Sequence, residues 1–403
     1  MLLLLPTSTY RATDFVAAAR TLGAEIIIAS DHRLAIGPAL PAESLVVDFS
    51  RPDRAAARIV AHCKRQPVDA IVPVDDEGVV AGAAAASELG LAHNPVEAVA
   101  ATRDKAELRR KLTAAGLPQP SSREVGPEAA VESPASEVGF PCVLKPLSMA
   151  ASRGVIRADN SEEAEAAAAR VRAIVASSSS VPEPLLVESY VPGPELALEG
   201  LLRHGRLEVL ALFDKPDELA GPFFEETIYV TPSRQPTGIR RQIAARCSAA
   251  VAALGLREGP VHVEVRLHDS EVWVIDVAAR SIGGLCSRSL HFGLGVSLEE
   301  LLLRHALGLP LDGLERAPGA SGVMMLPIPR AGLLQGVRGR DKVAAMPGID
   351  GLQITAVRGR LLRPLPEGDR YLGFMFASGA TPEEVEACLR RAYAELEIEI
   401  TAA

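Results

Sequence analysis

The segment 261–280, VHVEVRLHDSEVWVIDVAAR, constrains the fold of this chain more than any other part of the sequence. Alternating apolar residues flank the turn-forming residues 268–271, which predicts an antiparallel β-hairpin. If the hairpin is symmetric about Ser270, the side chain of Glu264 lies directly opposite that of Asp276. Like charges opposed across a ladder are destabilising, and apolar neighbours make the pair still less favourable. The hairpin therefore predicts either a cation between the two carboxylates or protonation of one of them, and for a cation, oxygen ligands of this kind suit Mg²⁺.

Arg280 extends this arrangement along the chain. It lies an even number of residues after Asp276, so its side chain points to the same face, further along the strand. A guanidinium at this position is placed to hold a phosphoryl group. The alternative is a surface hairpin with solvated acids and an arginine at its rim, which the otherwise apolar strands around the acids disfavour.

The composition excludes several classes of protein. The chain has 403 residues, 48% of them apolar, and a net charge of −9, which argues against binding to nucleic-acid phosphates. The five cysteines form no CxxC pair, which is typical of reduced thiols in a cytoplasmic protein. No stretch approaches the roughly 20 apolar residues of a membrane span. We therefore expect a cytoplasmic globular protein that binds neither nucleic acid nor membrane.

The N-terminal part of the chain alternates strand and helix patterns, which predicts an open parallel sheet. Ligands of such sheets bind beyond the carboxyl ends of the strands. Asp75, Asp76 and Glu77 follow the last of these strands, so they either face a substrate or stabilise a helix N-terminus. The glycine motifs of Rossmann and P-loop proteins are both missing from the sequence. The expected strands are Leu2–Leu5, Glu25–Ala29, Leu45–Phe49 and Ala70–Val74.

Two further segments have the residue types of a nucleotide site. Lys145 ends an apolar strand and precedes a loop of small residues, 148–154, whose backbone N–H groups can hold phosphate oxygens. An ordinary hairpin loop is the alternative. Glu188 ends the strand LLVES, and Glu195 follows a Pro-Gly turn. Such a hinge can bind adenine through its backbone and ribose through a carboxylate, whereas the plainer interpretation is a turn with two exposed acids.

Together and in this order, these features resemble the ATP-grasp superfamily over roughly residues 90–310. The resemblance implies the ATP-grasp fold, which combines α/β and α+β parts. It implies an N-terminal open parallel-sheet domain over 1–98, an ATP-grasp domain over 99–315 with a mobile lid at about 134–192, and a strand-rich C-terminal portion over 316–403. The features that carry it are Lys105, Lys145 with its loop, Glu188 and Glu195 in E-x6-E, Glu264 and Asp276 in E-x11-[ED], and Arg280.

The resemblance also implies roles for individual residues. The lysines bind phosphates, residues 188–191 form the adenine hinge and Glu195 binds the ribose. The residues expected to contact ATP are Lys105, Lys145, Ser148, Ser152, Gly154, Glu188, Ser189, Val191, Glu195 and Lys215. Those expected to bind Mg²⁺, with Mn²⁺ as the alternative ion, are Glu264 and Asp276. Those expected to be catalytic are Arg280 and Lys145, and those expected to contact the substrate are Glu226, His262, Arg280, Gly283 and Gly284, with a plain turn as the alternative for the two glycines.

Within the superfamily, the motifs HVEVR and DVAARSIGG resemble the L-amino-acid ligases of the bacilysin-synthetase and carnosine-synthase type. Those ligases have H-x-E and E-x-A-A-R at these places, and the tail segments GVMMLPIP and DRYLGFMFASG resemble them too. The chain departs from them at Asp276, which stands where those ligases have a glutamate and has a shorter side chain. Ala278 replaces the asparagine that is a further metal ligand in many other members, which leaves open whether one or two metal ions bind.

The activity that the resemblance implies is ATP- and Mg²⁺-dependent ligation of a carboxylate to an amine through an acyl phosphate. The expected partners are a small-molecule carboxylate and a small-molecule amine, with amino acids favoured, and a homodimer is the expectation from the superfamily. One alternative is an ATP-grasp ligase of purine or cofactor biosynthesis. Another, from a different class, is a nucleotide-binding protein that has lost catalysis, for which Asp276 and Ala278 are the support.

Overall fold

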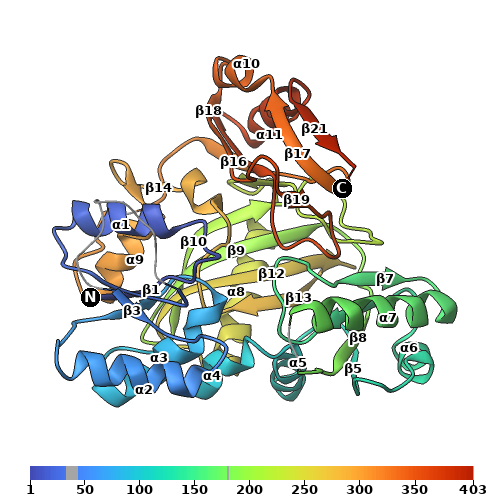
Figure 1. The fold of residues 1–403 in the computed structure, drawn as a ribbon, viewed down its shortest axis with the longest axis horizontal. Coiled ribbons are helices and arrows are strands. Elements are labelled where there is room, and N and C mark those ends of the chain that lie inside the picture. The colour runs from blue at the N-terminus through green and yellow to red at the C-terminus, as the bar shows by residue number, and fades with distance from the viewer. Residues whose placement is uncertain (33–43, 179–180, 314, 403) are drawn as a thin grey trace.

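The computed structural model describes residues 1–32, 44–178, 181–313 and 315–402 of the chain. Within these residues the strands form sheets of four, eight, two, three and four members. Figure 1 shows the N-terminal elements in blue and a small green sheet with its helices on opposite sides of the longest strands. The C-terminal elements, in orange and red, lie above them. The predicted mixture of α/β and α+β parts is confirmed.

The N-terminal sheet is parallel throughout, as predicted. Its strands are β1 (Leu2–Leu4), β2 (Ile27–Ser30), β3 (Ser44–Val46) and β4 (Ile71–Pro73), in the order β3-β2-β1-β4. Leucines of β1 alternate between two clusters, with Leu4 packing beside Ile59 and Leu3 beside Phe15. Both faces of the sheet are therefore covered, which explains the unbroken apolar run. The helices of this region are α1 (Ala12–Thr21), α2 (Pro52–Cys63), the 3₁₀ helix η1 (Asp76–Gly78), α3 (Val79–Leu89) and α4 (Val96–Ala101).

An eight-stranded antiparallel sheet forms the centre of the molecule, in the order β13-β12-β9-β10-β11-β16-β20-β18. Val263 and Leu198 on one face of it pack against helix α8. The other face carries polar side chains such as Glu199 and His262, together with apolar residues such as Phe213 that pack in a second cluster. Its strands are β9 (Glu195–Arg203), β10 (Arg206–Asp214), β11 (Ile228–Thr231), β12 (Gly259–His268), β13 (Glu271–Ala278), β16 (Ala320–Leu326), β18 (Ile349–Ile354) and β20 (Gly373–Gly379). The helices on its apolar side are α5 (Lys105–Ala114) and α8 (Thr237–Leu254).

The hairpin of β12 and β13 places Glu264 opposite Asp276, as the sequence predicts. The route differs from the symmetric hairpin about Ser270. The turn is tighter, with His268 paired to Glu271, and a β-bulge then shifts the register between Glu264 and its neighbour. The tight turn alone would have misaligned the two acids by one residue, and the bulge restores their alignment.

A four-stranded sheet with two helices lies beside the central sheet (Figure 1). It overlaps the segment predicted as a lid and extends further towards the N-terminus, while the predicted lid motion and domain boundaries stay predictions. Its strands are β5 (Ser122–Val125), β6 (Cys142–Pro146), β7 (Ile156–Ala158) and β8 (Leu185–Ser189), in the order β5-β8-β6-β7, and its helices are α6 (Glu132–Val138) and α7 (Ser161–Ser178).

The C-terminal region is rich in strands, as predicted, and it completes the central sheet through β16, β20 and β18. Helix α11 (Pro382–Tyr393) packs on β16 and β20. The remaining elements are η2 (Cys286–Ser289), β14 (His291–Phe292), β15 (Val296–Ser297), α9 (Leu298–Ala306), α10 (Arg340–Ala344), and the sheet of β19 (Leu361–Leu362), β17 (Gly332–Arg338) and β21 (Glu397–Thr401). Among the helices of the described residues, none combines the length and apolarity that crossing a bilayer requires.

The tip of the β12–β13 hairpin generates a stability prediction. Asp269 and Ser270 have φ values of 49° and 63°, which non-glycine residues adopt at a cost and which Asn-Gly adopts readily. We expect replacement of the pair by Asn-Gly to raise the free energy of unfolding by about 1 kcal/mol, measured by urea denaturation. Ser270→Val is the opposite control, because a β-branched residue is strained at positive φ. Destabilisation by Asn-Gly would contradict this turn geometry.

Candidate active site

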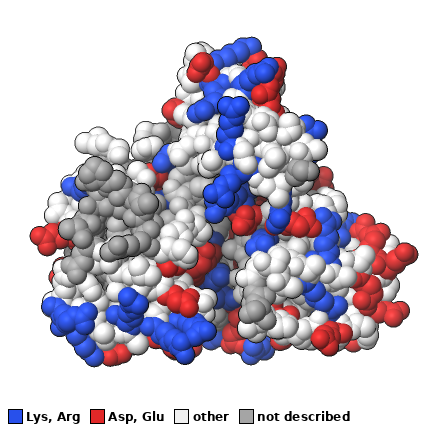
Figure 2. Space-filling model, in the orientation of Figure 1, with Lys and Arg blue, Asp and Glu red and all other residues white. Residues whose placement is uncertain are grey.

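A cavity of about 500 Å³ lies between the polar face of the central sheet and the small sheet. Figure 2 shows a recess in the middle of the molecule, with basic and acidic side chains gathered along it. Among the residues singled out from the sequence, those that line the cavity are Lys105, Lys145, Ser148, Ser152, Glu188, Ser189, Val191, Glu195, Glu226, His262, Glu264, Asp276, Arg280, Gly283 and Gly284. Lys215 lies just behind the wall, and Gly154 does not reach the cavity.

The floor of the cavity is the polar face of β9, β12 and β13. Side chains of a strand alternate between faces, and paired residues share a face. The side chains gathered on this face by the ladder are the pairs Glu195 and Arg266, Glu199 and His262, and Glu264 and Asp276. The period-two pattern of ELALEG and VHVEVR is the sequence signal for this common face.

Lys215 neutralises three carboxylates at the centre of this floor. Its buried amine lies 2.7 Å from Glu195 Oε1 and 2.8 Å from Glu264 Oε1, and it also bonds to Glu226. Burial lowers the pKa of Lys215, but the three carboxylates outweigh burial and hold the pKa well above its ordinary value. Burial raises the pKa of Glu226 to about 7. Lys215 therefore stays charged, and it is what permits the carboxylates to lie together.

The same carboxylates have the chemistry of a divalent-cation site. Oxygen atoms of Glu195, Glu226 and Glu264 lie within 4.8 Å of one another. Asp276 borders the cavity across the ladder from Glu264. Hard oxygen donors around a cavity that can accept phosphates match the preference of Mg²⁺. The amine of Lys215 already bonds to all three of these glutamates, so the donors left for the ion are the opposed carboxylates of Glu264 and Asp276, which fit its preference for oxygen.

Glu188, at the end of β8, is held between two basic residues. Arg109 Nε donates to its Oε1 at 2.6 Å, and Lys145 bonds to its other oxygen. Burial raises the pKa of Glu188, but Arg109 and Lys145 outweigh burial and lower it. Glu188 is therefore an ionised, buried acceptor at the edge of the cavity, rather than one of the exposed turn acids of the plainer interpretation.

The loop after β6 closes over the other side of the cavity. Lys105 Nζ donates to the carbonyl of Met149 at 2.6 Å, which ties helix α5 to this loop. Ser148 and Ser152 line the cavity. The N–H of Gly154 donates to the carbonyl of Pro366 at 3.0 Å. Because this N–H is already used, Gly154 is not available to hold a phosphate in this arrangement, in contrast to the expectation from the sequence.

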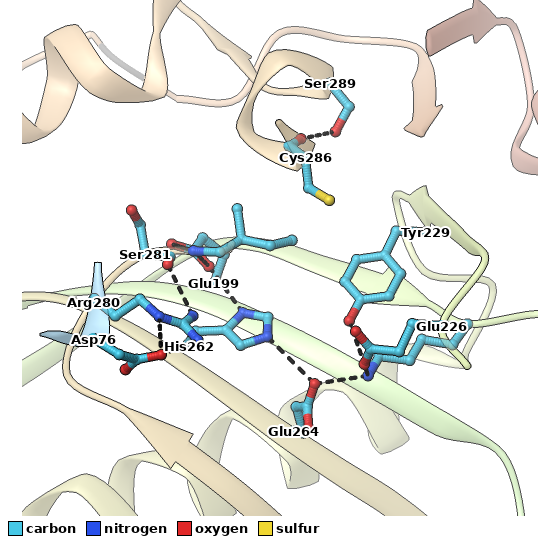
Figure 3. A network of polar contacts seen from close by, with 12 residues as sticks. Asp76, Glu199, Glu226, Tyr229, His262, Glu264, Arg280, Ser281, Cys286 and Ser289 are labelled. Carbon is cyan, nitrogen blue, oxygen red and sulfur yellow. Dashed lines mark hydrogen bonds and ion pairs between the residues drawn. The ribbon is translucent and has the colours of Figure 1, made fainter. Parts of the chain in front are cut away.

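Arg280 is fixed by an acid from the N-terminal sheet (Figure 3). Its Nε and Nη2 donate to Asp76 Oδ2 at 3.1 and 2.9 Å, while Arg103 lies 3.3 Å from the other Asp76 oxygen. Burial raises the pKa of Asp76, but Arg280 and Arg103 outweigh burial and lower it to about 2. The sequence left open whether Asp76 faces a substrate or stabilises a helix, and the structure places it as the partner of Arg280.

The loop that follows Arg280 is held from two sides. Arg11, which is fully buried, donates to the Ser281 hydroxyl at 2.7 Å and to the Ile282 carbonyl at 3.1 Å. Glu199 accepts from the Ile282 N–H at 2.9 Å. Gly284 has a φ of 61°, and a Cβ there would lie 2.7 Å from the Phe374 ring. Only glycine therefore fits at this position.

Sequence reasoning missed several of these residues. Glu199 could have been found from the sequence, because it lies an even number of residues after Glu195 and so points to the same face, where it pairs with His262. The side chain of His262 contacts Glu199 at 3.2 Å and is 3.6 Å from Glu264. Arg11 and Arg109 had no local signal, because each meets its partners only through the tertiary fold.

Three family models match the chain. The ATP-grasp N-terminal domain matches residues 16–93, the ATP-grasp domain matches residues 138–289, and the L-amino acid ligase C-terminal domain 2 matches residues 324–401. The chain also resembles the crystal structure of an L-amino acid ligase from Bacillus licheniformis, with a TM-score of 0.86 and 26% identity over 99% of this chain and 98% of that one.

Two curated relatives differ in how much of the chain they match. The alanine–anticapsin ligase of Bacillus subtilis is 28% identical over 59% of this chain, and the match spans only 53% of that relative. The formate-dependent phosphoribosylglycinamide formyltransferase of Paraburkholderia xenovorans is 27% identical over 94% of this chain and 91% of its own length. The similarity therefore extends to more than one kind of relative.

The pairing of Asp76 with two arginines predicts a pH-dependent stability. Because its pKa is lowered from 3.8 to about 2, Asp76 stabilises the fold above pH 3.8, and this contribution is lost as the pH falls through 2. We expect Asp76→Asn to lower the free energy of unfolding by roughly 2 kcal/mol at pH 7, with the difference shrinking below pH 3.8. Urea denaturation across this pH range measures it.

A substitution of an exposed acid provides the control for this prediction. Asp312→Asn removes one carboxylate from an exposed position, and we expect it to change the free energy of unfolding by less than about 0.5 kcal/mol. Equal effects of the two substitutions would show that the ion pairs of Asp76 contribute no stability.

Proposed function

Since this chain belongs to the ATP-grasp superfamily, we propose that it is an ADP-forming ligase that joins the carboxylate of an amino acid to an amine. The observation that carries the proposal is the single cavity that Lys105, Lys145, Glu264, Asp276 and Arg280 line together. The matches to an L-amino acid ligase C-terminal domain and to a solved L-amino acid ligase support amino acids as substrates.

ATP binds between the small sheet and the central sheet. Lys105 and Lys145 hold its phosphates, because both amines lie at the cavity beside the loop after β6. The ionised Glu188 and the backbone of Val191 bind the adenine, as hinge residues at the end of β8. Glu195 takes the ribose hydroxyls, and Arg266 fixes its orientation through a 2.8 Å bond.

Glu264 and Asp276 are the residues that hold Mg²⁺. When bound, the ion supplies neutralisation of phosphate charge and orientation of the γ-phosphoryl group. Lys215 bonds to Glu264 and Glu226 beside them and offsets part of their negative charge, which leaves negative charge for the ion to balance. This arrangement supports Lys215 as a residue that stabilises the site from behind the cavity wall.

The reaction has two steps. The substrate carboxylate attacks the γ-phosphorus, and the bond from phosphorus to ADP breaks, which gives an acyl phosphate. The amine then attacks the acyl carbon, inorganic phosphate leaves, and the nitrogen releases a proton to solvent. Arg280, oriented by Asp76, stabilises charge on the transferred phosphoryl group. The backbone of Gly283 and Gly284 lies against the same part of the cavity and suits the acyl oxygen.

A ligase of purine or cofactor biosynthesis is the second candidate. The observation that favours it is the match to the phosphoribosylglycinamide formyltransferase, which covers nearly the whole chain. Against it stands the C-terminal segment 324–401, which matches the L-amino acid ligase model. Product mass separates the two, and a non-catalytic nucleotide-binding protein would release no ADP at all.

The first experiment measures ADP and phosphate release with ATP and Mg²⁺ against amino acids, supplied singly and in pairs. We expect release to depend on particular amino acids, and the mass of the product to identify the pair that is joined. Glu264→Gln and Arg280→Ala should each lower the rate by roughly 100-fold or more, because each removes charge stabilisation of phosphoryl transfer.

Glu397→Gln is the matched control, because it neutralises an exposed strand glutamate of β21. We expect it to retain the full rate, and circular dichroism should show that all three variants are folded. Measurable ATP binding without ADP release for any amino acid would overturn the amino-acid ligase and favour a different carboxylate or a non-catalytic role.

A further inference from the structure

The cavity continues past the polar floor into an apolar compartment, which we define by Tyr10, Ile282, Cys286, Met325 and Tyr371. None of these residues belongs to the nucleotide, metal or phosphoryl machinery described above. They come from the N-terminal region, the loop after β13, strand β16 and the C-terminal region. The compartment is therefore assembled by the whole fold, and it borders the place where the substrate carboxylate reacts.

Phe374 forms the back of the compartment. Its ring lies 5.1 Å from the ring of Tyr10 and 5.8 Å from the ring of Tyr371, both in edge-on contact. Met325 pairs directly with Phe374 in the ladder between β16 and β20, so their side chains share a face. A Cβ at Gly284 would lie 2.7 Å from the Phe374 ring. The wall is thus closely packed, and it has a defined shape.

The compartment faces the reactive residues from the opposite side of the cavity. Figure 3 shows Cys286 above the sheet, with its side chain directed towards the space bordered by His262, Tyr229 and Glu226. If the carboxylate of a substrate lies near Arg280, the rest of that substrate lies close to Ile282 and Cys286, which line the same cavity. The side chain of the substrate is therefore what the compartment is placed to receive.

The five side chains that define the compartment carry no charge. Burial raises the pKa of the Cys286 thiol and of the Tyr371 phenol, so both stay neutral. Glu226 and Lys215, whose charges act on both groups, bond to each other. Asp369 and Arg370 also line the cavity beside Tyr371, but their side chains are largely exposed and lie 4.0 Å from each other. A charged side chain entering here would lose its hydration without finding a free counter-charge, whereas an apolar side chain would lose only unfavourable contact with water.

We propose that the apolar compartment binds the side chain of the amino acid whose carboxylate is activated, and that this amino acid is uncharged and apolar. The inference rests on the proposed ligase function and adds the class of its acyl substrate.

The first test compares matched amino acids in the wild-type protein. ADP release is measured with leucine against asparagine, and with methionine against glutamine, lysine and glutamate, each with the amine that supports turnover. We expect kcat/KM for the apolar member to exceed that of its size-matched polar partner by about 10-fold or more. A preference for the charged or amide amino acids would overturn the inference and leave the ligase function standing.

The second test uses two neighbouring methionines of β16. Met325→Ala enlarges the apolar compartment and should shift the ratio of kcat/KM for phenylalanine over leucine upwards by about 10-fold. Met324→Ala is the matched control, because Met324 is equally buried but packs on the other face of the sheet with Leu326. We expect it to keep the wild-type ratio.

The possible failures are distinguishable. An unchanged ratio in a folded Met325→Ala variant, or an equal shift in both variants, would overturn the compartment as the side-chain site. If Met325→Ala does not fold, the comparison of matched amino acids in the wild type still decides. Failure of every amino acid to support ADP release would instead overturn the ligase function, and the inference with it.

Discussion

Burying several carboxylates on one face of a sheet requires cations at fixed places, and the rest of this structure follows from that requirement. Lys215 holds three of the acids together, and Arg266 holds Glu195 from the other side. In the low dielectric of the interior an unpaired carboxylate would be protonated or would destabilise the fold. The bases are therefore as necessary to the fold as they are useful to the chemistry.

The acids on the floor of the cavity belong to the central sheet, but distant parts of the chain hold the residues around them in place. Asp76 reaches Arg280 from the N-terminal sheet, and Arg11 reaches the following loop from the same region. The apolar compartment adds Tyr371 from the C-terminal region. The site is thus a junction of all the layers, which explains why its residues are spread over most of the sequence and why local patterns reveal only part of it.

The sequence was sufficient to predict contacts between side chains where these contacts depend only on the alternation of side chains along a strand. Opposed Glu264 and Asp276 followed from alternation in a hairpin, and the pairing is confirmed even though the turn and the register near it differ. The ordered motifs predicted the superfamily, and the parallel N-terminal sheet followed from its alternating elements. Contacts between distant segments were not predictable. Arg109 beside Glu188 and Pro366 on the Gly154 N–H depend on how layers pack, and no spacing in the chain encodes that.

The bulge in β13 changes the register of the hairpin, so that residues near the tip pair in one register and Glu264 and Asp276 pair in another. Residues between the turn and the bulge set one register, and Asp276 belongs to the other. On the far side, β12 is bonded to β9 along its whole length, so the position of Glu264 does not depend on the tip. The tip is consequently free to vary, whereas insertion or loss of one residue between Asp276 and Arg280 would change the direction of the Arg280 side chain relative to that acid. The hairpin can therefore change in length at its tip without moving the two opposed acids, because the register of those acids is set by the pairing of β12 with β9 and by the bulge.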